Sequence, residues 1–505
     1  MVPVIAIDRA APRPLHRQLY EGLRVSITDG TLRAGQRLPS SRGLASELGL
    51  SRITVLNAYA QLLAEGYLQS RIGSGTVVCR SLPDQAGVWN PQAGNGVRSR
   101  SARRRLSQRA RLLDPVSLTH AAFGRNPESA RSGAFVLGQV ALSDFPFQLW
   151  KGLLTRRARA TCTESLDYGD NVGSRALREE IARYLRTARA THCEADQIMI
   201  VSGSQQALEI ATRVLLDPGD GVWMEEPGYR FARNIFRVHG CRIVPVRVDR
   251  EGLDVHHGIK RYRAARAALV TPSHQYPTGV TMSASRRFQL LEWAERSGAW
   301  IIEDDYDSEY RFDSMPVGCL QGLDQAARVI YVGTFSKVLF PSLRLGYLVI
   351  PPDLMERFIA VRLAMDIAPP AFQQAVLADF IREGHFSRHL RRMRLLYAQR
   401  RSALVESIRN EFGDEAEITG EQAGMHLSLT LRGISDRHLA ELAGQQNLWL
   451  APLSYSYIEK NRRQGFILGF GSTSAEEIPA AVRKLRTLVD SARRVSSVKP
   501  QLVAS

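Results

Sequence analysis

Lys337 is the residue of this sequence best suited to act as a nucleophile. It lies in the segment GTFSKVLFPSLRLGY, among small hydroxylated residues and directly after an apolar run typical of a buried strand. A partly desolvated lysine near a second cation has a lowered pKa and can form a Schiff base, and Arg344 follows seven residues later. Thr334, Ser336 and Arg344 are also suited to holding a phosphate. From this segment alone, a structural lysine in a polar loop remains an alternative.

Three consecutive acidic residues follow a second apolar run. They are Glu303 to Asp305 in the segment AWIIEDDYD. Neighbouring carboxylates next to a buried strand are costly unless a cation accompanies them. A pyridinium nitrogen is one partner that makes chemical sense. A bound metal ion or an internal arginine is the alternative.

Two further segments are suited to a flat, phosphorylated ligand. In VSGSQQALEIA, Ser204 and Gln205 begin a predicted helix directly after a strand, where free N–H groups attract anions. In MEEPGYRF, Tyr229 follows another strand and could stack on a ring. Each signal is weak alone, because many strand–glycine–helix turns look alike and most such tyrosines belong to a core.

The elements that must position these residues follow an alternating pattern. From about residue 116, short β-rich apolar runs alternate with longer amphipathic segments. This pattern predicts an α/β fold with a mostly parallel sheet, and ligands bind at the carboxyl ends of strands in such sheets. From about residue 370, helix, strands and helix predict a smaller C-terminal α+β lobe. The apolar runs are QIMIVSG, AALVTPSH, AWIIEDDYD, RVIYVGTFSK and RLGYLVI.

The order phosphate cup, ring stacker, acid and lysine resembles that of a fold-type I aminotransferase, over about residues 135–495. Such enzymes bind pyridoxal 5′-phosphate. The resemblance implies that Lys337 forms the internal aldimine, that Asp304 pairs with the pyridine nitrogen, and that Tyr306 donates to the cofactor phenolate. It implies that Tyr229 stacks on the ring. The residues implied to bind the phosphate are Ser204, Gln205, Thr334, Ser336 and Arg344.

The segment YGDNVGSRALREEIARYL also fits this family. The resemblance implies that Tyr168 reaches the phosphate of a partner subunit, which requires a dimer. Two positions depart from active aminotransferases. Their Asn-Pro-Thr-Gly motif begins with Tyr276 here, and Ile467 stands where they keep the arginine for a substrate α-carboxylate. Both departures favour a domain with at most residual transaminase activity.

The N-terminal part of the chain is the more basic part. Residues 1–115 hold 17 arginines and no lysine against seven acidic residues, so they carry +10 of the total net charge of +17. Within 12–80, apolar residues every four positions from Leu15 to Ile27 predict a helix. Two more helices follow, capped by Ser40 or Ser41 and by Ser51, with Gly49 between them. Short strands around the turn 72–75 predict a hairpin.

This pattern, from RPLHRQLY to IGSGTVV, resembles the GntR-type winged helix-turn-helix. Such a module places its second helix in the major groove, and a wing rich in glycine and arginine can approach the backbone. The resemblance implies DNA contacts from Arg42, Ser51, Arg52, Thr54 and, in the wing, Arg71. Three-helix packing without DNA is the alternative that the helices alone would leave open.

The order winged helix, linker and aminotransferase-like domain is similar to that of the MocR family of transcriptional regulators, as are SHQYPTG and EDDYDSEYRFD. We expect the DNA-binding domain at 12–80 and a flexible basic linker at 81–115. An aminotransferase-like domain for cofactor binding, dimerisation and effector binding is expected at 116–495. The resemblance implies a double-stranded DNA operator, a head-to-tail homodimer, and an effector that is pyridoxal 5′-phosphate, an amine or an amino acid.

The missing arginine at Ile467 bears on the effector, since an unpaired buried carboxylate would be costly there. We therefore expect pyridoxal 5′-phosphate itself to be the signal. The alternative is an amine with another acid group, bound by Arg462 or Arg463. An active aminotransferase with an accessory DNA-binding domain, and a dimerisation domain that has lost its cofactor, are the other two hypotheses.

The composition bears on the compartment. Five scattered cysteines with no CxxC pair argue against a zinc site or a disulfide framework and favour a reduced cytoplasm. The N-terminus lacks the features of a signal peptide. No apolar run approaches the roughly 18 residues that a membrane-spanning helix needs.

Overall fold

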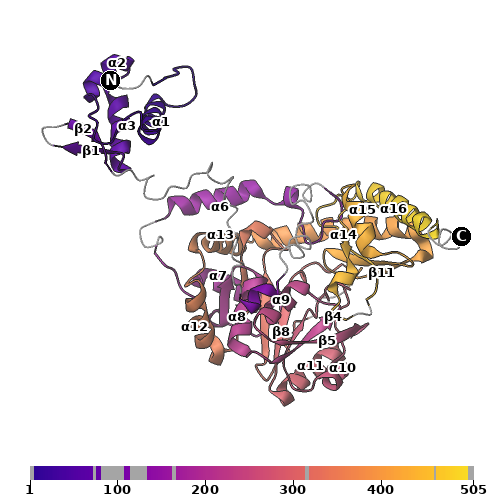
Figure 1. Ribbon diagram of the computed structural model, residues 1–505. Coiled ribbons are helices and arrows are strands. Elements are labelled where there is room, and N and C mark those ends of the chain that lie inside the picture. Colours follow the sequence, from indigo (N-terminus) through magenta and orange to yellow (C-terminus); the bar gives the residue numbers. More distant parts are fainter. Residues whose placement is uncertain are drawn as a thin grey trace. The chain divides into compact units, whose positions relative to one another are not determined.

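The chain divides into two compact units, residues 1–105 and 106–505. The structure, a computed structural model, describes residues 5–71, 75–80, 107–113, 133–161, 167–312, 318–459 and 462–498 (Figure 1). Most of the predicted linker at 81–115 lies outside the described residues. Within it, Gln108–Arg111 form the short helix α4.

The N-terminal unit consists of three helices and an antiparallel hairpin. Its elements are α1 (Leu15–Thr28), α2 (Ser41–Leu48), α3 (Arg52–Ala64), β1 (Leu68–Arg71) and β2 (Gly75–Val78). The predicted caps are confirmed: the Ser40 hydroxyl accepts from the Gly43 amide, and the Ser51 hydroxyl accepts from the Thr54 amide. Gly49 ends α2 with a φ of 63°, a left-handed conformation that glycine adopts without steric cost.

The core of this unit lies between α1, α3 and the hairpin. Leu19, Leu23 and Ile27 of α1 are buried, as their four-residue spacing predicts. They pack with Val55 and Leu62 on the inner face of α3. The opposite face of α3 therefore stays available to solvent.

The large unit is built on an eight-stranded sheet with the order β3-β10-β9-β8-β7-β4-β5-β6. The strands β9, β8, β7, β4 and β5 are parallel, which confirms the predicted mostly parallel sheet. Strand β10 runs antiparallel to both of its neighbours, because the connection from β9 is too short for a crossover helix. The strands are β3 (Ile198–Val201), β4 (Gly221–Glu226), β5 (Arg242–Asp249), β6 (Gly252–Leu253), β7 (Ala265–Val270), β8 (Trp300–Asp305), β9 (Val329–Thr334) and β10 (Gly346–Val349).

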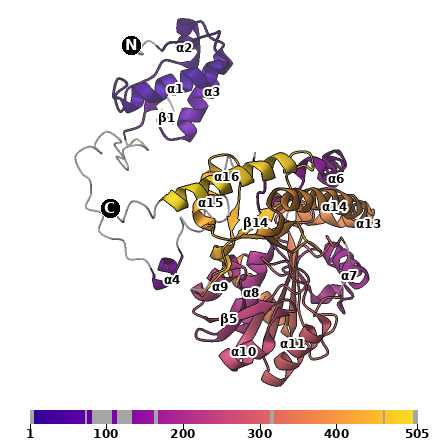
Figure 2. The ribbon, with the colours of Figure 1, turned by 90° about the vertical axis from the view of Figure 1, so that its right-hand side faces the viewer.

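Helices cover both faces of this sheet (Figures 1 and 2). Alternate residues of one strand enter different cores: Ile302 packs with the first group of helices, whereas Ile301 packs on the opposite face. The first group is α8 (Ser204–Leu215), α9 (Arg230–Val238) and α12 (Met355–Met365). The opposite face carries α7 (Arg175–Arg189), α10 (Val255–Arg261) and α11 (Ala284–Ser297).

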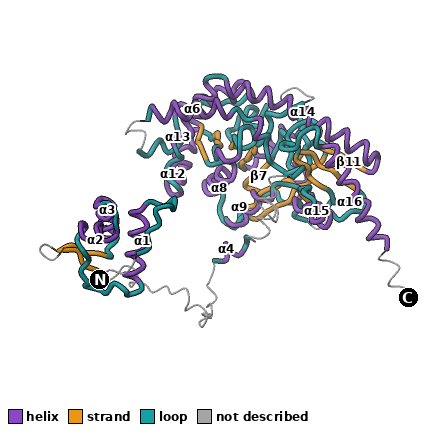
Figure 3. Tube along the Cα trace, turned by 90° about the horizontal axis from the view of Figure 1, so that it is seen from above, coloured by secondary structure: helices purple, strands orange, loops and turns teal. Residues whose placement is uncertain are grey.

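The C-terminal lobe contains a four-stranded antiparallel sheet with the order β11-β12-β14-β13, and the predicted α+β lobe is confirmed. Long helices pack against it, as the purple tubes of Figure 3 show. The elements from α6 onward that complete the unit are α6 (Phe147–Arg159), α13 (Ala371–Arg382), α14 (His385–Phe412), β11 (Ala416–Thr419), β12 (His426–Leu431), α15 (Asp436–Gly444), β13 (Ala451–Pro452), β14 (Phe466–Gly469) and α16 (Ile478–Val498).

The two faces of the small sheet have different surroundings. Leu427, Leu429 and Leu468 enter the apolar core beneath α14 and α16. Because side chains alternate along a strand, Ser428 and its cross-strand partner Ile467 lie on the other face. The Ser428 hydroxyl donates to the Pro277 carbonyl at 2.7 Å, so this second face meets the loop that follows β7.

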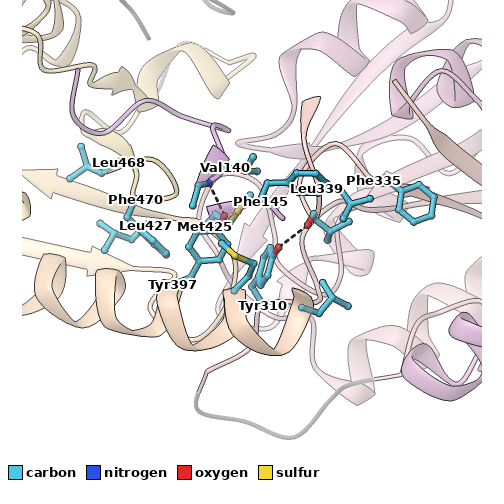
Figure 4. Close-up of a cluster of buried hydrophobic side chains, with 14 of the residues drawn as sticks. Val140, Phe145, Tyr310, Phe335, Leu339, Tyr397, Met425, Leu427, Leu468 and Phe470 are labelled. Atoms are coloured by element: carbon cyan, nitrogen blue, oxygen red, sulfur yellow. Dashed lines mark hydrogen bonds between the residues drawn. The ribbon is translucent and has the colours of Figure 1, made fainter. Parts of the chain in front are cut away.

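One apolar cluster joins this lobe to the loop that carries Lys337. Figure 4 shows Met425 and Leu427 beside Tyr397 of α14, with Leu468 toward one side of the cluster and Leu339 and Phe335 toward the other. The Tyr397 hydroxyl accepts a hydrogen bond from the Ala141 amide at 3.0 Å. The residues on both sides of Lys337 are therefore fixed by side chains from three distant parts of the sequence.

The expectations about membrane-spanning helices and about cysteines can be compared with the described residues. Among them, no helix is long and apolar enough to cross a membrane. The four cysteines within the described ranges, Cys79, Cys193, Cys241 and Cys319, are free.

Candidate functional site

Lys337 lies in the turn that follows β9, at the carboxyl edge of the large sheet. Its Nζ donates to the Gly138 carbonyl at 2.9 Å. Burial lowers the pKa of Lys337, while Asp307 and Asp304 act in the opposite direction. Gly138 has a φ of 77°, and a Cβ there would lie 2.5 Å from Nζ. The backbone thus approaches the amine as closely as glycine allows, and the amine is held in a setting that favours its uncharged, nucleophilic form.

Asp304 is the acid of the triplet that lacks a partner. It is 4% exposed, and its Oδ1 has no hydrogen-bond partner within the described chain. Burial first, and then the charges of Asp305, Glu225 and Asp307, raise the pKa of Asp304 to about 7. A buried carboxylate oxygen without a partner is costly, and the N–H of a pyridinium ring would satisfy it.

The other two acids of the triplet have partners within the protein, although Asp305 Oδ1 has none among the described residues. Asp305 pairs with Arg189, whose Nη2 lies 2.7 Å from the carboxylate, so the internal-arginine alternative applies to this residue. Glu303 accepts from the backbone amides of Leu320 and Gln321 at 2.9 and 3.0 Å. Of the three, Asp304 is therefore the carboxylate with neither an arginine nor a backbone amide as partner in the described chain, and it is the one suited to a ligand.

The residues predicted to hold a phosphate surround the N-terminus of α8. Ser204 is the first residue of that helix, and Gly203 before it has a φ of 101°. A Cβ on Gly203 would lie 3.5 Å from the Arg344 guanidinium. The Ser336 amide donates to the Thr334 hydroxyl at 3.2 Å, and the buried Ser336 hydroxyl has no partner among the described residues. A helix N-terminus, a guanidinium and an unused hydroxyl together suit an anion.

Tyr229 and Gln205 lie side by side. The Gln205 side-chain amide donates to the Tyr229 hydroxyl at 3.1 Å. Burial raises the pKa of Tyr229, and Asp304 raises it further. The Tyr229 ring meets Tyr276 edge to face, with the centroids 5.6 Å apart. Gln205, which the resemblance assigns to the phosphate, here fixes the aromatic ring that the resemblance assigns to stacking.

Tyr306 is held by a part of the site that sequence reasoning missed. Its hydroxyl donates to the His274 carbonyl at 3.0 Å and lies 3.1 Å from His274 Nδ1. That nitrogen also lies 3.1 Å from both carboxylate oxygens of Asp307. His426 of β12 lies against His274, with the ring centroids 4.8 Å apart. The motifs SHQYPTG and EDDYDSEYRFD contain His274, Tyr306 and Asp307, but nothing in the sequence joins them to His426.

Several predicted residues lie apart from this buried group. Tyr168 is 79% exposed, as a residue that serves a partner subunit would be. Arg462 and Arg463 are exposed, and Arg463 forms an ion pair with Glu417 at 2.5 Å. Neither arginine lies in the buried group around Lys337, whereas Ile467 is 1% exposed on the face that meets Pro277.

The N-terminal unit presents three of the predicted DNA-binding residues, Arg42, Ser51 and Arg52, on its surface. Arg42, on α2, and Arg52, on the first turn of α3, are exposed. The hydroxyls of Ser51 and Thr54 lie 2.7 Å apart, so both are engaged at the start of α3. Arg71 ends β1, and the predicted wing turn beyond it, 72–74, lies outside the described residues.

Arg37 is a basic residue of this surface that the sequence analysis did not select. A Cβ on Gly75 would lie 3.1 Å from Arg37 Nε. This guanidinium therefore lies at the first residue of β2, on the strand that begins after the wing turn. The sequence does not show that Arg37 lies beside β2. The folded chain does, through the β-bridge between Arg37 and Val77.

Comparison with known proteins covers both units. The family model described as "Bacterial regulatory proteins, gntR family" matches residues 15–78, and that described as "Aminotransferase class I and II" matches residues 141–484. The chain is 41% identical to the probable rhizopine catabolism regulatory protein MocR of Rhizobium meliloti, over 96% of this chain and 95% of that protein. It is 31% identical to the pyridoxine biosynthesis transcriptional regulator PdxR of Corynebacterium glutamicum, over 93% and 94%.

The large unit also resembles a solved enzyme. A kynurenine aminotransferase from Pyrococcus horikoshii, crystallised in complex with PMP, superposes with a TM-score of 0.70 at 26% identity. The alignment covers 76% of this chain and 97% of the enzyme. The cofactor of this fold-type I domain is pyridoxal 5′-phosphate, and the residues present fit it: an amine for its aldehyde, a partnerless carboxylate for its ring nitrogen, and a cup for its phosphate.

When bound, this cofactor supplies an aldehyde carbon that takes a primary amine, together with a ring that withdraws electrons. The protein's own contribution is to lower the pKa of the Lys337 amine and to bury the Asp304 carboxylate. With a DNA-binding unit of the gntR family in front of this domain, the chain belongs to the MocR family of transcriptional regulators.

Proposed function

We propose that the chain is a DNA-binding transcriptional regulator whose affinity for its operator is controlled by pyridoxal 5′-phosphate and by amines that combine with it. The observation that carries the proposal is Asp304, a buried carboxylate with a partnerless oxygen in the same unit as the buried amine of Lys337. A purely structural domain would gain stability by replacing both. The name of one relative, a regulator of pyridoxine biosynthesis, supports cofactor-linked control.

The proposed division of labour follows the predicted boundaries. Residues 12–80 bind DNA through Arg42, Arg52 and the wing, 81–115 tether the two units, and 116–495 hold the cofactor and form the dimer. We propose a head-to-tail homodimer, which the exposure of Tyr168, the residue expected to serve a partner subunit, supports. The place of action is the cytoplasm, where the operator lies.

An active aminotransferase is the less favoured function. Ile467 is buried on the sheet face that meets Pro277 and supplies no charge for a substrate α-carboxylate. Tyr276 occupies the position of the asparagine that active enzymes keep, and burial raises its pKa to about 12, so it is a neutral hydroxyl. The site therefore lacks the arginine that usually binds the α-carboxylate during repeated turnover of α-amino acids.

The test measures operator binding with and without the cofactor. Cofactor-free protein is titrated onto intergenic DNA that flanks the gene, and footprints are compared before and after pyridoxal 5′-phosphate is added. By linkage, the ligand shifts DNA binding only as far as its affinity differs between the two arrangements of the protein. Unchanged affinity and footprint, both with the cofactor alone and with amines added, would refute the proposal.

A further inference from the structure

Two buried histidines with partnerless nitrogens lie beside the candidate cofactor site. His274 and His426 are 2% and 4% exposed, and the Nε2 atom of each has no hydrogen-bond partner among the described residues. The ring of Tyr306 lies next to both, with centroid separations of 6.0 and 6.4 Å. Buried polar atoms in folded proteins nearly always have a hydrogen-bond partner. Two neighbouring nitrogens without one therefore indicate a ligand-binding position.

A hydroxyl group can satisfy either partnerless nitrogen, whichever of the two ring nitrogens carries the hydrogen, because it both donates and accepts. The His274 Nδ1 lies 3.1 Å from the Asp307 carboxylate, so that side of the ring is engaged and Nε2 remains unpaired among the described residues. Burial lowers the pKa of His426 to about 3, with His274 lowering it further, so this ring is neutral.

The position on the small sheet beside the pair is apolar. Ile467 pairs with Ser428 across the small sheet, and His426 lies two residues from Ser428 on the same face. Ile467 and His426 are therefore diagonal neighbours, close enough for side-chain contact. A carboxylate placed here would face the apolar Ile467 side chain and a neutral His426 ring, whereas a hydroxyl could pair with either nitrogen.

We propose that His274 and His426 form a subsite for hydroxyl groups, and that the effector is a primary amine with a hydroxyl group, not a carboxylate, next to its amino-bearing carbon. This inference rests on the proposed function and narrows its effector. The amine nitrogen replaces Lys337 Nζ in the carbon–nitrogen double bond to the cofactor's aldehyde carbon. One such bond forms as the other breaks, and a proton passes from the incoming amine to the departing lysine.

A metal ion is the competing use of these side chains. Donor atoms of His274, Asp307 and His426 all lie within 4.8 Å of one another. However, Asp307 already holds Nδ1 of His274, as a carboxylate does behind a metal ligand. That leaves two nitrogens toward any ion, whereas zinc sites use at least three protein ligands. The geometry therefore favours an organic donor.

The experiment uses matched pairs of amines that differ in one group. Ethanolamine is compared with glycine, and serinol with L-serine, so that each hydroxymethyl group replaces a carboxylate. Full-length protein loaded with pyridoxal 5′-phosphate is titrated with each amine. The visible spectrum and the affinity for the flanking intergenic DNA are recorded. We expect the hydroxylated amine of each pair to change both at a concentration at least about tenfold lower, since an unsatisfied buried group costs about 1–3 kcal/mol.

Two variants locate the effect. Ile467→Arg should reverse the preference, with L-serine gaining about tenfold or more over serinol, because a guanidinium binds a carboxylate. His426→Phe should weaken the response to serinol by a similar factor while the Lys337-bound spectrum persists, which shows that the variant is folded and loaded. His438→Phe, at an exposed position of α15, is the matched control and should respond as the unmodified protein does.

Each outcome bears on one of the two proposals. The inference is overturned if L-serine or glycine acts at concentrations equal to or below those of its partner, if neither hydroxylated amine acts, or if His426→Phe responds normally. It is also overturned if the purified protein contains stoichiometric zinc that His426→Phe loses. In all these cases a cofactor-dependent change in DNA binding would leave the proposed function standing. Loss of the cofactor effect itself would remove both.

Discussion

The two units place their functional groups in opposite environments. The N-terminal unit carries its candidate DNA-binding residues, Arg42 and Arg52, on its surface, and its caps are made by residues three positions apart. The large unit holds its functional groups in less polar surroundings: Asp304 is buried and Lys337 is half-buried, and the shift in the pKa of each favours its uncharged form. The DNA-binding unit thus offers exposed positive charges to a polyanion. The cofactor-binding unit offers groups whose charged forms are disfavoured by burial.

The difference determines how each unit responds to substitution. An exposed arginine can be removed with little effect on the fold, so its loss reports on DNA alone. A buried carboxylate or amine contributes to both binding and stability, so its loss must be measured against a control for folding. The predictions below test this contrast, beginning with the group whose removal has the largest effect.

Lys337→Ala should abolish the covalent bond to the cofactor altogether. The described chain offers no second amine in the buried site, so the visible absorbance and the bond that borohydride reduces should both disappear. Peptide mass spectrometry after reduction checks the position. Lys260→Ala, at an exposed position, serves as the control and should keep both signals. Reduced cofactor found on Lys260 or Lys151 would show that the site has been wrongly assigned.

Asp304→Asn should remove a pH dependence from the stability of the cofactor-free large unit. The pKa of Asp304 is raised to about 7 from its ordinary 3.8, so between these values the folded state binds more protons than the unfolded state. Stability therefore falls as the pH rises from about 4 to about 7. One pKa unit corresponds to about 1.4 kcal/mol, so we expect a loss of a few kcal/mol in the unmodified protein.

Melting temperatures at about pH 5.5 and pH 8 test this sign. The difference between the two should be smaller in Asp304→Asn than in the unmodified protein. It will not vanish, because burial also raises the pKa of Glu225 and Glu303 to about 7. Loading with the cofactor should flatten the dependence as well, since a pyridinium partner favours the charged carboxylate. Equal pH dependence in variant and parent would mean that Asp304 is not the titrating group.

Arg52→Ala should weaken operator binding by about 1–3 kcal/mol if its guanidinium makes a bidentate base contact, and it should leave the cofactor spectrum unchanged. Arg17→Ala is the matched control: Arg17 is an exposed arginine on α1 that lies 3.5 Å from Glu21. Gel shifts over a range of salt concentrations check both variants, and the affinity of the parent should fall steeply with salt. An unaltered affinity for Arg52→Ala would count against α3 as the recognition helix.

The contrast also explains what could be predicted from the sequence. The caps at Ser40 and Ser51 were predictable because each bond closes within one turn. The buried strands were predictable from their uninterrupted apolar runs. The reversed direction of β10 was not, because strand direction depends on the length of a connection and not on the residues of the strand.

Within the site, the limit of prediction is sequence distance. That Asp305 and not Asp304 is paired depends on Arg189, which lies 116 positions away. The approach of Gly138 to Lys337 joins residues 199 positions apart. His426 joins His274 only because the Ser428 face of the small sheet packs on Pro277. Such partners share no local pattern, so motif reasoning could find the cofactor residues but not the histidine pair.

The smallest predicted effect concerns the helix caps, and it separates stability from recognition within the N-terminal unit. Ser51→Ala and Ser40→Ala each remove one N-cap bond, which costs about 0.5–2 kcal/mol. Hydrogen exchange should therefore accelerate in the first turn of α3 in one variant and of α2 in the other. Both variants should also weaken DNA binding, Ser51→Ala more than Ser40→Ala, because the turn that Ser51 caps carries Arg52 and Thr54 whereas the turn that Ser40 caps carries Arg42 alone. Equal losses of affinity in both variants would indicate that the two helices contact DNA as a single rigid body, with Arg42 contributing as much as Arg52.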